Sequence, residues 1–129
     1  MTVTTTAPPV QEYELRGRNG DVFRFTGQRL GSGSSDRPDK DRWFEVDIYV
    51  GAVADEKTYI VHTQGMSRVP NEVTRARIAF SASPYEVIEL LTVNHDGKLY
   101  IPRQSSHALA QAAQWDDGIR DAYVNRAVL

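Results

Sequence analysis

The chain has 129 residues, no cysteine and a formal net charge of −2. The lack of cysteine excludes a disulfide scaffold, a thiolate metal site and a cysteine nucleophile. The near-neutral charge leaves no strong overall positive field for nucleic acid or an anionic membrane. With 40% hydrophobic and 25% charged residues, the composition is typical of one globular domain.

No run of the sequence approaches the ~20 apolar residues that a membrane helix needs. The first residues have neither the basic start nor the apolar stretch of a signal peptide. These features predict a soluble, cytoplasmic protein without membrane contact. Residues 1–11 are rich in threonine and proline and predict a flexible tail. Residues 12–129 predict a single domain.

The first predicted elements form a β-hairpin. Apolar and polar residues alternate from Tyr13 and again from Val22 to Thr26, and Asn19-Gly20 stands between the two runs. Asn-Gly favours a hairpin turn because both central residues need a positive φ. Residues 31–41 contain almost nothing that can pack, so they predict a mobile loop.

Residues 42–52 give the clearest strand signal, a strict alternation with a period of two. One face is apolar, and we expect it to point inward beneath helices: Phe44, Val46, Ile48 and Val50. We expect the other face to point outward: Trp43, Glu45, Asp47 and Tyr49.

Two more strands are predicted over residues 58–63 and 73–82, the first after a turn at residues 54–57. Ser83, Pro84 and Glu86 match a capping box and predict a short helix that ends at residues 94–97. Residues 98–102 predict an edge segment. The longest helix is expected to begin at Ser105 or Ser106, with a break at residues 116–118.

Together these elements predict an α+β fold. We expect an antiparallel β-sheet of about five strands, with one short helix and a longer C-terminal helix packed on one face.

The carboxylates Glu45 and Asp47 are the most interesting candidate group. They lie on one strand face, roughly 6.6–6.8 Å apart from the rise of a strand. Trp43 and Tyr49 flank them, so this face is the predicted contact surface for a partner. An alternative is a small enzyme that uses the two acids with His62 for proton transfer, because a histidine beside a carboxylate suits that chemistry.

A second candidate surface is the first hairpin, where Arg16, Arg18 and Arg24 cluster with Arg29 at its exit. A basic and aromatic sheet face suits single-stranded nucleic acid. Interleaved acids favour an ordinary solvated surface instead. No two histidines have a metal-ligand spacing, and no phosphate-binding loop is present, so no metal or cofactor is predicted.

The run from Trp43 to Tyr49, followed by residues 58–62, resembles the EXLDI family of small, mostly actinobacterial proteins. That family is named for a Glu-x-Leu-Asp-Ile motif ahead of a tyrosine. In this chain Glu45 stands two residues before Asp47, with Val46 between them. The resemblance covers residues 15–125 and implies a small protein of the bacterial cytoplasm, with no known activity.

The leading hypothesis is therefore a non-enzymatic binding or accessory protein with a protein partner. The small enzyme and the nucleic-acid-associated protein remain alternatives. The terminal helix, with small apolar residues and the anchors Trp115 and Tyr123, also suits a homodimer contact.

Overall fold

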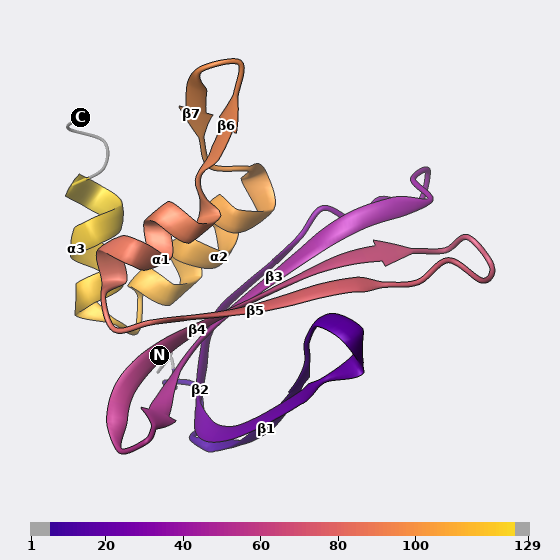
Figure 1. Ribbon diagram of the computed structural model, residues 1–129. Helices are drawn as coiled ribbons and strands as arrows, with labels where there is room; N and C mark the ends of the chain where they lie inside the picture. Colours follow the sequence, from indigo (N-terminus) through magenta and orange to yellow (C-terminus); the bar gives the residue numbers. More distant parts are fainter. Residues whose placement is uncertain (1–5, 126–129) are drawn as a thin grey trace, which may run out of the picture.

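The computed structural model describes residues 6–125, which form an α+β domain (Figure 1). Its main sheet is antiparallel, with five strands in the order β1-β2-β3-β4-β5. The strands β6 and β7 form a separate two-stranded hairpin. This confirms the predicted fold class. The strands are β1 (Gln11–Arg16), β2 (Val22–Ser34), β3 (Arg42–Val53), β4 (Glu56–Ser67), β5 (Arg75–Ser81), β6 (Val93–His95) and β7 (Lys98–Tyr100). The helices are α1 (Pro84–Leu91), α2 (Arg103–Ala113) and α3 (Asp117–Asn125), with a short 3-10 turn, η1 (Arg18–Gly20), after β1. No helix in the described range is long and apolar enough to cross a membrane.

Tight turns produce the consecutive strand order. Between β3 and β4, Ala54 and Asp55 have φ values of 51° and 64°, the positive values that a two-residue hairpin turn requires. Asn19 and Gly20 also have positive φ, 61° and 79°, which confirms the hairpin predicted there. Because Arg16 pairs with Val22, the connection in that hairpin comprises residues 17–21 rather than the Asn-Gly pair alone.

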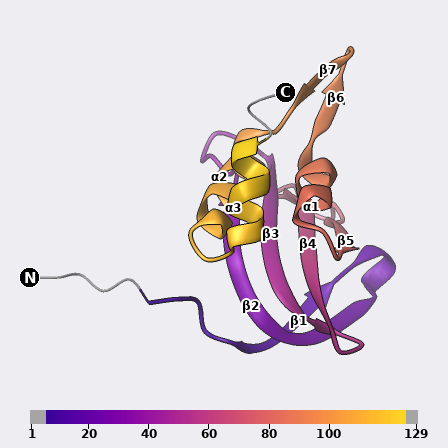
Figure 2. The same ribbon diagram turned by 90° about the vertical axis from the view of Figure 1, so that its left-hand side faces the viewer.

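One face of the sheet is covered by the three helices, as predicted (Figure 2). Val46 and Ile48 of β3 are buried there with side chains from α1, α2 and α3. Phe44 was expected on this inward face, but 61% of it is exposed. The reason is length: a strand of 12 residues spans ~40 Å, whereas a helix of 11 residues spans ~16 Å. The helices therefore leave the Phe44 end of β3 uncovered.

The opposite face is buried as well, by the first hairpin. The sheet curls so that β1 and η1 come against β5, and Nε2 of His62 lies 2.8 Å from the backbone oxygen of Arg16. A second apolar cluster fills the enclosed space: Leu15, Phe25, Tyr49 and Ile60. The expectation that Tyr49 points to solvent was wrong, since only 4% of it is exposed. Alternation in β3 identifies two faces, but it does not reveal that a distant hairpin covers the second one.

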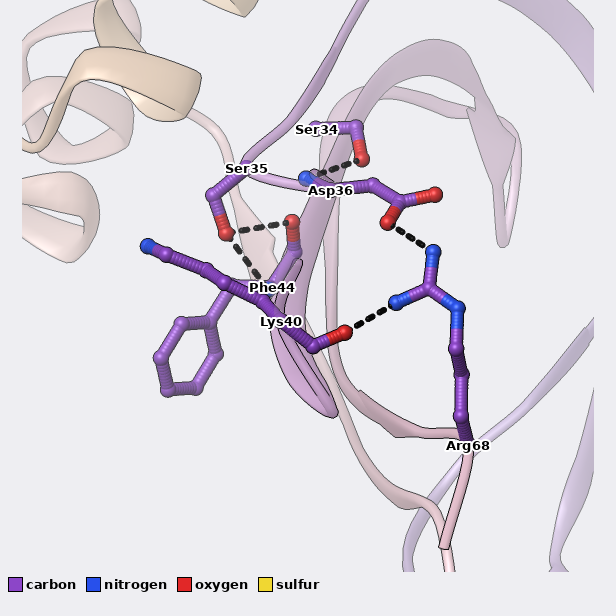
Figure 3. A network of polar contacts seen from close by, with 6 residues as sticks. All are labelled: Ser34, Ser35, Asp36, Lys40, Phe44 and Arg68. Carbon is purple, nitrogen blue, oxygen red and sulfur yellow. Dashed lines mark hydrogen bonds and ion pairs between the residues drawn. The ribbon is translucent and has the colours of Figure 1, made fainter. Parts of the chain in front are cut away.

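The predicted loop over residues 31–41 is shorter than expected, because β2 continues to Ser34. Polar contacts hold the remaining loop, residues 35–41, in place (Figure 3). Arg68 donates to Asp36 and to the backbone oxygen of Lys40, while Ser35 Oγ accepts from the backbone N–H of Phe44 at 2.8 Å. The structure thus holds this loop against the end of β4.

The helix ends agree in part with the sequence signals. Ser83 caps α1 by accepting from the backbone N–H of Tyr85 at 3.2 Å, and Pro84 occupies the first turn. Glu86 does not complete the capping box; its carboxylate accepts from the Ser81 hydroxyl at 3.1 Å. The predicted start of the long helix at Ser105 or Ser106 was wrong. α2 begins at Arg103, because Pro102 suits the start of a helix, and Ser105 is buried within it.

The C-terminal helix is broken as predicted, but the break comprises residues 114–116, and Asp117 and Gly118 lie in the first turn of α3. Asp116 stabilises this break. Its carboxylate accepts from the backbone N–H of Ile119 at 2.9 Å, which caps α3. The same carboxylate accepts from the Tyr59 hydroxyl at 2.9 Å, and Lys57 Nζ lies 3.6 Å away. This group connects the start of α3 to β4 in the core.

The Tyr59–Asp116 contact predicts a loss of stability in alkali. Burial, followed by the hydrogen bond to Asp116, raises the pKa of Tyr59 above its ordinary value of 10.0. The contribution of the neutral Tyr59 hydroxyl to the stability of the fold is fully present below about pH 10. It is lost as the pH rises further, because this hydroxyl ionises at a lower pH in the unfolded chain than in the folded one. We expect Tyr59→Phe to cost about 1–3 kcal/mol at pH 7. The measurement is urea unfolding of both proteins between pH 7 and about 11. The difference in the free energy of unfolding between the wild type and Tyr59→Phe should shrink above pH 10. A difference that stays constant with pH would contradict the stabilising role of the Tyr59–Asp116 hydrogen bond.

Candidate functional site

The predicted contact face of β3 is only partly accessible. Tyr49 is buried, and Trp43 is half-buried beneath Arg68, whose guanidinium carbon lies 4.3 Å from the indole ring centroid. Glu45 and Asp47 remain half-exposed, and neither has an ion-pair partner within residues 6–125. The two carboxylates and part of Trp43 are therefore accessible to a partner, whereas Tyr49 is not.

The acid–base group of the enzyme alternative, Glu45, Asp47 and His62, lies on two adjacent strands. Asp47 of β3 pairs directly with His62 of β4, whereas Glu45 pairs with Gln64. The backbone oxygen of Arg16 can only accept a hydrogen bond, so His62 donates its Nε2 proton to it. This arrangement uses His62 to hold the first hairpin on the sheet.

The arginines of the first hairpin do not form one surface. Arg24 makes an ion pair with Glu14 across the outer face of the hairpin, with Nε 3.0 Å from the carboxylate. Arg16 lies on the same face and Arg18 in the turn, both exposed. Arg29 lies further along β2, beside Tyr49. The hairpin therefore offers a mixed-charge face, and its role in nucleic-acid binding stays a prediction.

A feature that the sequence analysis missed is the hairpin β6–β7. Residues 94–97 were expected to end a helix, but α1 already ends at Leu91. Asp96 and Gly97 have φ values of 52° and 82° and form a two-residue turn between the paired residues His95 and Lys98. Asp-Gly between short extended runs is a strong hairpin signal and could have identified this element.

The β6–β7 hairpin stands away from the sheet and the helices (Figure 1). Every residue of both strands is exposed, including 71% of Leu99 and 49% of Tyr100. An isolated two-stranded hairpin is at best marginally stable in water, and three strands or packing against another element are needed. The chain thus presents a hairpin with three exposed apolar residues, Val93, Leu99 and Tyr100, and without the support that such elements require.

These features define an α+β domain with a curled antiparallel sheet, a helical layer and a projecting hairpin. Comparisons with known proteins found no match: no family model, no curated protein and no solved structure matches the chain. Within residues 6–125, no group of three or more His, Asp or Glu side chains could hold a metal ion. A functional proposal therefore rests on the surface of the domain itself.

Proposed function

We propose that this chain is a non-enzymatic binding module that contacts a second copy of itself through the β6–β7 hairpin. The main support for this proposal is that all six strand residues of β6 and β7 are exposed, including the apolar side chains of Val93, Leu99 and Tyr100. Addition of strands from another chain supports such an element, because main-chain hydrogen bonds then extend the sheet. The bacterial cytoplasm is the proposed location.

The backbone of the hairpin favours self-pairing along β7. In a two-residue hairpin the residues that flank the turn, His95 and Lys98, bond to each other. Because the pattern alternates, the N–H and C=O of Leu99 point away from β6 and are free to bond outward. Two copies related by a twofold axis at Leu99 would exchange both bonds and form a four-stranded sheet, which exceeds the three strands needed for stability.

Side chains fit the same register. With Leu99 opposite its counterpart, Lys98 lies across from Tyr100 of the second copy on both sides of the axis. This avoids two facing lysines and allows a cation–π contact on each side. Self-pairing along β6 would instead place Asn94 at the axis and Val93 across from His95. β7 is the better edge, because Leu99 is the most exposed apolar residue of the hairpin.

The test is the solution mass of the full chain as a function of concentration. A contact of this size predicts a dissociation constant on the order of 100 µM, so light scattering should show the average mass rising from 14.5 kDa towards twice that value. Leu99→Glu should keep the protein monomeric, because two carboxylates would face each other at the axis.

The matched control is Val22→Glu, which places the same charge at a 46%-exposed strand residue of the first hairpin. This variant should associate as the wild type does. A wild-type mass that stays at the monomer value up to about 500 µM would contradict the proposal. So would equal association of the Leu99→Glu protein.

Two predicted surfaces remain secondary candidates for other partners. Glu45 and Asp47 have no ion-pair partner in the described part of the chain, which favours a basic partner at that face. Arg16 and Arg18 are exposed, which leaves room for nucleic acid, whose binding would weaken steeply with added salt.

A further inference from the structure

A surface pocket of about 320 Å³ lies where the N-terminal segment, β2 and the end of α2 meet. Its volume is at the lower end of the range for small-molecule sites, which is about 300–1,000 Å³. The pocket lies on a different part of the chain from the β6–β7 hairpin. The residues that line it include Pro8, Tyr13, Arg29, Ser32, Gln111 and Trp115.

An irregularity in β2 opens this pocket. The register between β2 and β3 shifts between Arg29 and Gly31, so Leu30 is an extra residue and turns into the helix-covered core. The shift leaves Arg29 and Ser32 in the pocket wall on either side of Gly31, whose lack of a side chain lets the backbone of α2 approach β2 closely.

Hydrogen bonds hold the walls in place. Gln111 Oε1 of α2 accepts from the backbone N–H of Ser32 at 3.0 Å. Gln28 Nε2 donates to the backbone oxygen of Pro8, a wall residue, at 2.8 Å, which holds the N-terminal segment against β2. Such fixed walls lower the ordering cost of binding a small ligand.

Arg29 supplies the charge of the pocket. It lies beside the buried Tyr49, where it favours the ionised hydroxyl, although burial still raises the pKa of that tyrosine overall. Arg29 has no carboxylate partner within residues 6–125. An arginine without an acidic partner, in a pocket with fixed walls, is suited to a carboxylate, which its planar guanidinium can bind through two hydrogen bonds.

The other walls indicate the body of the ligand. Trp115 and Tyr13 contribute aromatic surface, and Pro8 and Pro9 add rigid apolar surface. Flat apolar groups bind well against aromatic rings. We infer that this pocket is a binding site for a small carboxylate with a flat apolar body, oriented by Arg29 and held against Trp115.

The test uses benzoate as the probe and the fluorescence of Trp115 as the readout. The chain has two tryptophans, so Trp43→Phe leaves Trp115 as the only reporter. We expect benzoate to change the fluorescence of Trp115 in a saturable way. The neutral isostere benzamide should bind at least about tenfold more weakly. Inorganic phosphate, which lacks the apolar body, should also bind at least about tenfold more weakly.

Arg29→Gln should weaken benzoate binding by about tenfold or more, whereas Arg24→Gln, a matched change on the outer face of β2, should not alter it. Shifts of the Ser32 backbone and Gln111 side-chain amide signals in the wild-type chain give a second readout if Trp43→Phe does not fold. Absence of saturable binding, equal binding of benzamide, or unchanged binding by Arg29→Gln would overturn the inference. Leu99→Glu should bind benzoate normally, so the outcome is independent of the hairpin.

Discussion

Gly31→Ala is expected to lower the free energy of unfolding by about 3 kcal/mol, at the upper end for overpacking. A Cβ atom at this position would lie 2.0 Å from the backbone oxygen of Ala108 and 2.9 Å from the backbone nitrogen of Ala112. Both atoms belong to the backbone of α2, so no side-chain rotation can relieve the clash. The helix would have to lift from β2 and expose the buried side chains of Ala108 and Leu109.

Urea unfolding measures this loss, and Gly65→Ala is the matched control. Gly65 also lies within a strand, but a Cβ there would have its nearest neighbour at 3.8 Å, an ordinary contact. We expect the Gly65→Ala protein to stay within about 1 kcal/mol of the wild type. Equal stability of the two variants would mean that α2 does not rest directly on β2.

Ile60→Ala is the second large effect, with an expected cost of about 2–5 kcal/mol. Ile60 is fully buried, in the cluster that the first hairpin covers. Its removal leaves a cavity among Leu15, Phe25 and Tyr49, which the paired strands cannot easily collapse. Ile48→Ala, the equivalent change on the helix-covered face, should cost a similar amount because Ile48 is also fully buried.

Thermal or urea unfolding of both isoleucine variants tests whether the sheet is buried on both faces. Phe44→Ala serves as the control for an exposed strand residue and should cost less than about 1 kcal/mol. If Ile60→Ala behaved like Phe44→Ala while Ile48→Ala was costly, the face beneath the first hairpin would be open to water.

Much of the fold could be predicted from local patterns. The alternation of residues 42–52 identifies β3, Asn19-Gly20 identifies the first hairpin, and Ser83-Pro84 identifies the start of α1. These signals are local because each depends on residues within a few positions of one another. For the same reason they say little about how far each element extends.

The curvature of the sheet could not be predicted in this way. Tyr49 is buried because the first hairpin, far away in sequence, folds over it. Gly31 and Gly33 of β2 mark a different feature, the close approach of α2, because a Cβ there would lie 2.0 or 1.9 Å from a backbone oxygen of that helix. In the sequence these two glycines fit a loop, because serines and charged residues follow them.

The candidate sites depend even more on long-range structure. The pocket beside Arg29 exists only because α2 and the N-terminal segment meet at an irregularity in β2. By contrast, Asp96-Gly97 was a readable hairpin signal. The same two residues also fit a helix end, because Asp and Gly terminate helices as well, and this ambiguity conceals the hairpin.

The contact between two β6–β7 hairpins is tested most directly by nuclear Overhauser effects between differently labelled copies of the wild-type chain. At concentrations where self-association is expected, cross-peaks should connect the Lys98 side chain of one copy to the Tyr100 ring of the other. If every cross-peak from Leu99, Lys98 and Tyr100 arises within a single copy, the hairpin does not bind a second copy.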